Sequence, residues 1–216
     1  MKSQDRRVAR DLLQIKAIKL NPQNPFTWAS GRRSPIYCDN RVVLSYPAVR
    51  SAIVADLVAL AATFSGVTGV AGVATAGIPH GALLADRLNV PFIYIRSSAK
   101  EHGRQNVIEG ELQVGASYLV VEDLISTGGS SLQAVAALRA AGGQVAGVVA
   151  LFTYGFPEAS AAFAAAGCPL RTLSHYDALL EEAWSTGYIS QEQQAFLANW
   201  RQDPIAWSAN FNKLNP

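Results

Sequence analysis

Residues 118–132 read Y-L-V-V-E-D-L-I-S-T-G-G-S-S-L, and this stretch predicts the fold of the chain. The apolar, β-branched run is typical of a buried strand that stops at the adjacent carboxylates of Glu122 and Asp123. The glycines and hydroxyls that follow predict a loop and a helix that begins near Ser130. Glycines that admit a ligand to the backbone, hydroxyl donors and the positive end of a helix dipole together suit a phosphate group.

The two acids narrow the choice of ligand. Carboxylates beside a phosphate loop would repel the ligand unless they face another part of it, and neighbouring sugar hydroxyls are the natural partners. The stretch lacks the Gly-Lys-Ser/Thr of a P-loop and the G-x-G-x-x-G spacing of a dinucleotide fold. A phosphorylated ribose is therefore the favoured ligand, and an ordinary strand-to-helix turn with acids placed by chance is the alternative.

This pattern resembles the phosphoribosyl-diphosphate (PRPP) motif of type I phosphoribosyltransferases. The resemblance implies that Glu122 and Asp123 bind the ribose 2′ and 3′ hydroxyls, and that the loop holds the 5′-phosphate. It implies PRPP contacts from the whole segment after the acids, namely Leu124, Ile125, Ser126, Thr127, Gly128, Gly129 and Ser130.

Strands and helices alternate along the chain, which predicts a doubly wound α/β fold with a mainly parallel sheet flanked by helices. The ligand is expected at the carboxyl ends of the strands. An N-terminal helix over residues 4–19 and a hood segment make up residues 1–45, and residues 46–216 form the core with C-terminal helices, all in one compact domain. The expected core strands are 67–73, 90–95, 119–121, 144–152 and 170–173, and the expected helices are 47–63, a second helix ending near 88, 130–141, 157–166, 176–187 and 191–201.

Residues 26–39, F-T-W-A-S-G-R-R-S-P-I-Y-C-D, carry two arginines and several aromatic rings. Taken alone, this segment could equally be a surface hairpin with no functional role. It resembles the N-terminal segment of orotate phosphoribosyltransferases, which forms a hood over the pyrimidine. The resemblance places Tyr37 and Cys38, together with Ser126, near orotate; Ala29 stands where many members of the family carry lysine.

Residues 96–111 show little periodicity and combine Arg96, Lys100, His102 and Arg104 with two glycines, Gly103 and Gly110. A solvated hairpin is one reading. A leaving diphosphate, however, needs concentrated positive charge, and a mobile loop that closes over the site would supply it and exclude water.

The same segment resembles the catalytic loop of orotate phosphoribosyltransferases, in which Arg96, Lys100 and His102 match residues that contact PRPP. These three residues and Asp123 are the predicted catalytic residues. In the family the loop reaches into the neighbouring subunit, which implies a homodimer with shared sites. The chain departs from many relatives at Ala76, Ser97 and Ser98, where lysines are common.

Composition bounds the remaining possibilities. The chain has 216 residues, is 50% hydrophobic and 16% charged, and carries a formal net charge of +2. A large core or a subunit interface is expected, and neither nucleic acid nor membrane is an expected partner. Cys38 and Cys168 lack metal-type spacing, and the charged N-terminus lacks an apolar signal core, so a cytoplasmic protein is expected.

The resemblance implies transfer of the 5-phosphoribosyl group from PRPP to orotate, giving orotidine 5′-monophosphate and diphosphate in pyrimidine biosynthesis. A magnesium cofactor, Mg²⁺, is expected to neutralise the leaving group, with no dedicated metal ligands predicted from the protein. Two alternatives stay open here. One is a phosphoribosyltransferase for another nucleobase, against which the hood argues, and the other is a non-catalytic PRPP-sensing regulator, which would need a basic face or a winged-helix module.

Overall fold

The computed structural model describes residues 2–28, 30–97 and 107–214. The chain divides into two compact units, one formed by Met1–Tyr46 with Ser174–Pro216 and the other by Pro47–Leu173. The boundary after Tyr46 lies close to the predicted one. The C-terminal helices, however, group with the N-terminal segment instead of with the core, because their packing partners are α1 and β3.

The second unit is built on a sheet. Within the described residues, six strands pair in the order β10-β9-β8-β5-β6-β7. Their bounds are β5 Gly69–Val73, β6 Phe92–Ile95, β7 Ile108–Glu109, β8 Ser117–Ile125, β9 Gln144–Thr153 and β10 Leu170–His175, of which the last runs into the first unit. The pairs β5/β6, β5/β8 and β8/β9 are parallel, and the short β7 is antiparallel to β6.

The strand order reverses between β5 and β8. The chain adds β6 on one side of β5 and then returns to add β8 and β9 on the other side. Ligands of doubly wound proteins bind beyond the carboxyl ends of the strands at such a switch point. The predicted fold class is therefore confirmed, and the fold directs attention to the segments that follow β5 and β8.

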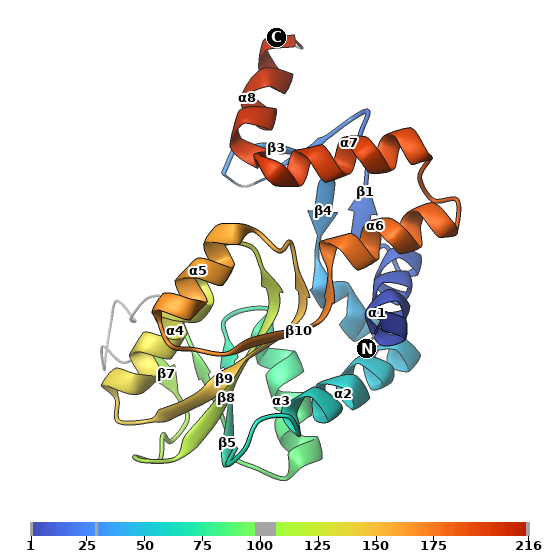
Figure 1. Cartoon of the computed structure of the whole chain (residues 1–216). Coiled ribbons are helices and arrows are strands. Elements are labelled where there is room, and N and C mark those ends of the chain that lie inside the picture. The colour runs from blue at the N-terminus through green and yellow to red at the C-terminus, as the bar shows by residue number, and fades with distance from the viewer. Residues whose placement is uncertain (1, 29, 98–106, 215–216) are drawn as a thin grey trace. The chain divides into compact units, whose positions relative to one another are not determined.

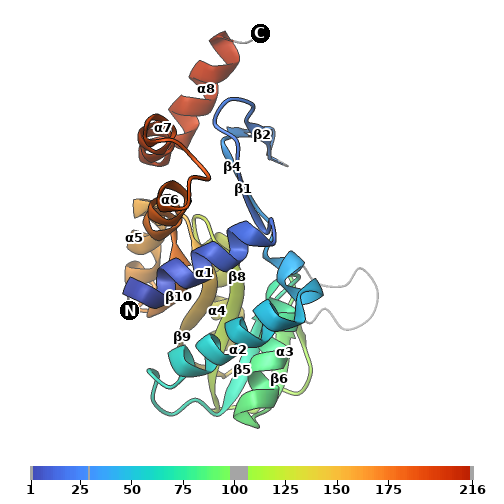
Figure 2. The same ribbon diagram turned by 90° about the vertical axis from the view of Figure 1, so that its right-hand side faces the viewer.

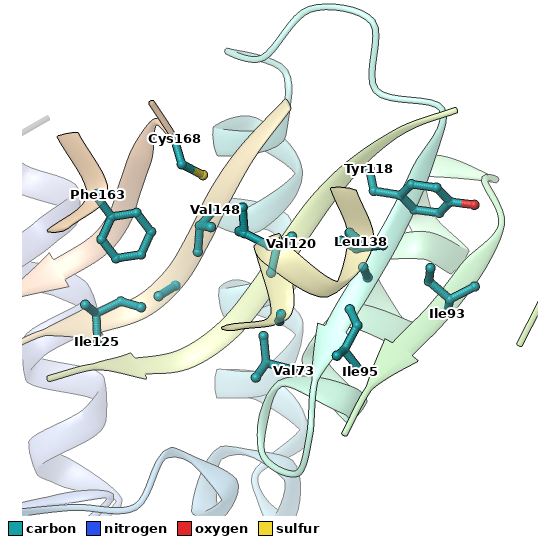
Figure 3. Packing of buried hydrophobic residues seen from close by; sticks show 14 of the residues in the cluster. Val73, Ile93, Ile95, Tyr118, Val120, Ile125, Leu138, Val148, Phe163 and Cys168 are labelled. Atoms are coloured by element: carbon teal, nitrogen blue, oxygen red, sulfur yellow. The ribbon is translucent and has the colours of Figure 1, made fainter. Parts of the chain in front are cut away.

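Helices cover both faces of this sheet (Figure 1). Helices α2 (Pro47–Ala61) and α3 (Gly77–Leu88) lie on one face, and α4 (Gly129–Ala140) and α5 (Pro157–Ala165) lie on the other. Successive side chains of a strand point to opposite faces of the sheet, so alternate residues pack against the helices on each face. Figure 3 shows the cluster beneath α4 and α5, in which Val120, Val148 and Leu138 are fully buried. Each such side chain contributes about 1.5–3 kcal/mol of burial free energy.

Glycines allow α3 to lie directly against the sheet. A Cβ at Gly81 would stand 2.8 Å from the ring of Phe92, and a Cβ at Gly77 would collide with the carbonyl oxygen of Val121. Gly77 is the first residue of α3, and Val121 immediately precedes the acid pair of β8. Close packing thus holds the N-terminus of α3 beside the functional end of β8.

The first unit combines small strand pairs with helices. It contains α1 (Lys2–Gln14), β1 (Ile18–Leu20), β2 (Phe26–Thr27), β3 (Arg33–Ser34), β4 (Ile36–Cys38), the 3-10 helix Asn40–Ser45, α6 (Tyr176–Ser185), α7 (Gln191–Gln202) and α8 (Pro204–Leu214). β1 pairs antiparallel with β4, and β2 pairs antiparallel with β3. α1 packs on α6, where the buried carboxylate of Glu182 accepts hydrogen bonds from Arg6 at 3.0 Å and Arg10 at 2.6 Å.

The helix predicted over residues 4–19 is too long at its C-terminal end. α1 ends at Gln14, because Lys16 takes a left-handed backbone (φ 59°) that an α-helix cannot continue through. Residues 18–20 then gain hydrogen-bonded partners in β4, which the apolar spacing alone did not indicate. The chain also contains α8, a helix absent from the predicted elements. No helix within the described ranges is long and apolar enough to cross a bilayer.

Candidate active site

Strand β8 runs through the acid pair instead of stopping at it. Its pairing with β9 continues from Glu122 opposite Ala150 to Ile125 opposite Thr153. The prediction of a strand that ends at Val121 was therefore wrong by four residues, because the long strand β9 supplies partners beyond Val121. The acids consequently sit on rigid backbone.

Glu122 is held inside the protein. Its side chain is 5% exposed, and it accepts hydrogen bonds from the hydroxyls of Ser130 and Ser131, both at 3.3 Å. The backbone N–H of Asp123 donates to Glu122 Oε1 at 3.1 Å. Burial, and next the neighbouring negative charge of Asp123, raise the pKa of Glu122 to about 8. Burial thus favours the protonated form of Glu122.

Asp123 has a different environment. It is only half-buried, whereas Glu122 faces the first turn of α4. Two adjacent carboxylates that share a site resist simultaneous ionisation, so the more solvated one keeps the negative charge. The two acids, which the motif treats alike, therefore have unequal environments: Glu122 is buried against α4, and Asp123 is half-buried.

The segment after β8 forms a cup of backbone N–H groups. α4 begins at Gly129, one residue before the predicted start, and its N-cap is Gly128. A glycine has no side chain with which to cap the helix, so the N–H groups of the first turn are available to a ligand. Thr127 and Ser130 are exposed at the rim, and Ser126 is half-buried.

The structure places different constraints on Gly128 and Gly129. Gly128 has φ 85°, and a Cβ there would stand 2.7 Å from the ring of Phe163, so both the backbone and the packing require it. A Cβ at Gly129 would meet only Thr127 Oγ1, at 4.0 Å, and the backbone there is not left-handed. The fold therefore does not need glycine at 129.

Ile125 and Leu124 behave differently from the hydroxyl residues of the predicted PRPP segment. The side chain of Ile125 is 1% exposed and belongs to the core. Its carbonyl oxygen accepts from Tyr154 N–H and from the Thr153 hydroxyl, both at 3.1 Å. Leu124 is half-buried within β8. Structural support, therefore, is the role that the geometry shows for Ile125.

A second helix start lies at the other side of the switch point. α3 begins at Gly77, inside the loop predicted over residues 74–81, with Pro79 in the first turn, where proline is tolerated. Its N-cap, Ala76, has no side-chain oxygen to offer the first N–H groups. The preceding Ala74–Thr75 peptide bond is cis. Two helix N-termini without side-chain caps therefore follow β5 and β8, which are neighbouring parallel strands.

A cavity of about 290 Å³ lies between the ends of β5 and β6 and helix α4. Its lining includes Arg96 and Ser130, two predicted PRPP residues that are 34 positions apart, and Ser97, which is exposed. Arg96 Nη1 lies 3.5 Å from Glu109 Oε1 on β7, so its charge is partly compensated. Gln133 also lines the cavity and was not predicted. The available signal was its spacing, since it lies one helical turn after Ser130.

The remaining predicted site residues are distributed as follows. Lys100 and His102 lie outside the described residues, as do Ala29 and Ser98. Tyr37 and Cys38 belong to β4 in the first unit; Tyr37 is 37% exposed, and its ring centroid is 5.7 Å from that of Phe26. Ser126 belongs to the second unit.

A mainly parallel sheet with an acid pair at its switch point and two helix N-termini that lack side-chain caps offers anion-binding N–H groups close to carboxylate acceptors. Consistent with this geometry, the phosphoribosyl transferase domain model matches residues 57–162. This range contains both helix starts, both acids and the loop segment.

Whole-chain relatives specify the family. Orotate phosphoribosyltransferase of Bacteroides thetaiotaomicron is 56% identical over 210 residues, covering 97% of this chain and 99% of that protein. The enzyme of that name from Bacillus pumilus is 55% identical over 203 residues, covering 94% and 96%. The chain belongs to the orotate phosphoribosyltransferase family.

Solved structures agree with this family. Orotate phosphoribosyltransferase from Aeropyrum pernix has a TM-score of 0.71 at 30% identity, covering 85% of this chain and 99% of that chain. UMP synthase of Leishmania donovani has a TM-score of 0.79 at 27% identity, covering 93% of this chain but 43% of that longer chain.

Proposed function

We propose that the chain is an enzyme that transfers the 5-phosphoribosyl group from PRPP to N1 of orotate in pyrimidine biosynthesis. The C1–O bond to diphosphate breaks, a C1–N1 bond forms, and the products are orotidine 5′-monophosphate and diphosphate. The observation that carries the proposal is the acid pair of β8 leading into the glycine start of α4. The relatives of the same length and family support orotate as the acceptor.

We assign the 5′-phosphate of PRPP to one of the two helix N-termini and the diphosphate to the other. We assign the 5′-phosphate to Thr127–Ser130, because this segment presents both hydroxyls and the first N–H groups of α4. We assign the diphosphate to the segment before α3, where Ala76 restricts the contact to backbone N–H groups. Each helix end also provides the positive end of a dipole, so neither phosphate group depends on lysine there.

The ribose lies between these two anchors in the proposal. Asp123, the charged acid, accepts a hydrogen bond from a ribose hydroxyl, and Glu122 contributes a second contact if the ligand draws it away from the serines. Hydrogen bonds that involve a charged group contribute about 1.5–3 kcal/mol. Holding the ribose in this way orients C1 toward the incoming base.

Charge that grows on diphosphate as C1–O breaks needs preorganised donors. Arg96 lines the same cavity as Ser130 and is our candidate for such a donor among the described residues. Lys100 and His102 complete the proposed catalytic group by resemblance alone. For orotate, contacts from Ser126, Tyr37 and Cys38 remain predictions.

A magnesium ion is the proposed cofactor. Mg²⁺ prefers oxygen ligands and usually keeps waters and substrate phosphates in its shell. Among the described residues no group of three or more His, Cys, Asp or Glu side chains could hold a metal ion, and the carboxylate of Asp123 is the fitting hard donor at the site. When bound, the ion would neutralise charge on the diphosphate. The homodimer with a shared loop and the cytoplasmic location remain predictions.

One assay tests the activity. The purified protein is incubated with PRPP, Mg²⁺ and, separately, orotate, uracil, hypoxanthine or adenine, and nucleotide formation is followed. Product with orotate alone is the expected result. Product with another base but not with orotate would retain the phosphoribosyl transfer and reject the hood assignment, whereas PRPP binding with no product from any base would favour a sensor.

A further inference from the structure

The hairpin of the hood is too small to hold its own position. β2 and β3 contribute two residues each, Phe26–Thr27 and Arg33–Ser34. Trp28 N–H donates to Arg32 O at 2.9 Å and closes the turn. Isolated two-stranded hairpins are at best marginally stable, so other parts of the first unit must fix this one.

Helix α8 supplies a support from the far end of the sequence. The backbone N–H of Arg33 donates to Ser208 Oγ at 2.9 Å. Ser208 is 6% exposed, although most of its helix faces solvent. The hydroxyl oxygen therefore accepts a hydrogen bond from a backbone N–H at the edge of the β2/β3 pair. That N–H would otherwise need a water molecule as its partner. Figures 1 and 2 show α8 beside this hairpin, and α8 and β3 are in contact.

Aromatic contacts connect the same helices to the hood and to one another. The rings of Trp28 and Trp200 meet edge to face at 6.0 Å, and Trp28 Nε1 donates to Ile36 O at 3.1 Å. On α8, Trp207 packs on Phe196 of α7 at 5.6 Å and stacks on Phe211 at 5.4 Å. α8 thus packs on α7, and Trp200 of α7 contacts Trp28 of the hood.

We infer that α8, through Ser208, positions the hood for the base, so that Ser208 is a positioning residue for orotate. The inference rests on the proposed function. Phe26 lies opposite Ser34 in the hairpin and packs on Tyr37, so movement of β3 would displace the aromatic pair. The phosphate cup lies in the other compact unit and has its own supports in β9 and α3. Loss of the Ser208 bond should therefore affect orotate and spare PRPP.

The test compares three variants with the wild-type protein. Ser208→Ala removes the acceptor, Ser208→Thr keeps it, and Asn210→Ala changes an exposed residue of the same helix. For Ser208→Ala we expect the KM for orotate to rise about 3- to 10-fold, as for loss of one neutral hydrogen bond. The KM for PRPP should stay within about twofold, and Ser208→Thr and Asn210→Ala should resemble the wild type.

Hydrogen exchange provides a readout that needs no turnover. Peptides covering residues 26–38 should exchange faster in Ser208→Ala, while peptides from β8 and β9 should not change. Faster hood exchange together with the selective rise in orotate KM supports the inference. Unchanged hood exchange, an unchanged orotate KM, or equal rises for both substrates would overturn it. Absence of orotate turnover in the wild-type protein would instead reject the proposed function, and the exchange data would still show whether α8 holds the hairpin.

Discussion

At the scale of single residues, the acid pair shows how environment separates two neighbouring carboxyls. Glu122 is buried against two serine hydroxyls, and Asp123 is half-buried. The adjacency that suggests a joint role also prevents both groups from being charged at once.

Glu122 should make stability depend on pH. Its pKa is about 8 in the folded chain against an ordinary value of 4.5, so between these values the folded state holds a proton that the unfolded state releases. Folding stability should therefore fall as pH rises through this window. Glu122→Gln cannot ionise, and its free energy of unfolding should gain about 1–3 kcal/mol relative to the wild type between pH 5 and 9. Denaturant titrations at both pH values measure the change, with exposed Glu111→Gln as the control; a pH-independent difference would contradict the assignment.

Asp123 should matter for the ligand more than for the fold. Asp123→Asn keeps the size of the side chain but removes the charge, so PRPP binding or turnover should weaken by about 10- to 100-fold, as for loss of a charged hydrogen bond. The thermal midpoint should change little. Isothermal titration with PRPP and Mg²⁺, together with initial rates, measures the effect. Wild-type affinity and rate in this variant would remove Asp123 from the site.

At the scale of elements, the start of α4 contains two glycines with different roles. The fold requires Gly128, and we propose that the ligand requires Gly129. The left-handed Gly128 and its contact with Phe163 belong to the fold. Gly129 meets neither constraint, and alanine favours helix by about 1 kcal/mol relative to glycine. The fold would accept alanine at position 129, so we propose contact with the 5′-phosphate as the reason for glycine there.

The two glycines should therefore respond in opposite ways. Gly129→Ala should leave stability unchanged or raise it by up to about 1 kcal/mol, while PRPP affinity falls by at least about tenfold, because the methyl group occupies the approach to the helix N–H groups. Gly128→Ala should lower stability by about 1–3 kcal/mol. Thermal unfolding and PRPP titration of the same samples distinguish the two effects. Equal PRPP affinity in Gly129→Ala and the wild type would place the phosphate elsewhere.

At the scale of the whole molecule, the fold places both proposed phosphate anchors in one compact unit and the proposed hood in the other. Each anchor follows one of two neighbouring parallel strands, β5 and β8, so the distance between them is set by the sheet. The loop that should bring Lys100 to the diphosphate connects the sheet strands β6 and β7. Whether that loop serves its own site is a question about the assembly.

Mixed dimers answer this question. Lys100→Ala should lose about 10²–10³ in rate alone, as for removal of one preorganised donor. Asp123→Asn should lose about 10- to 100-fold alone, as for loss of a charged hydrogen bond. If the loop acts across the interface, a mixed dimer has one site with both defects and one with none, and should regain about half of the wild-type activity. Rates of reassociated subunit mixtures measure the recovery. No gain on mixing would show that each loop serves its own subunit.

The sequence by itself determined the local features of this protein. The apolar strand, the acid pair and the Ser/Thr/Gly loop are adjacent in the chain, so their order predicted the strand, the glycine-rich turn and the helix start. Alternating elements likewise predicted the doubly wound sheet. These inferences needed only short-range spacing, because strand and helix periodicities and glycine conformations are set by neighbouring residues.

Only the tertiary structure decided the features that depend on distant partners. The raised pKa of Glu122 arises from burial against α4, and the strand continues past the acids because β9 is long enough to pair with it. Residues 18–20 leave the predicted helix and pair with β4, and Ser208 of α8 accepts a hydrogen bond from Arg33 of β3, 175 positions away. Burial and hydrogen-bond partners across such separations follow from how the elements pack, which the local pattern of residues does not contain.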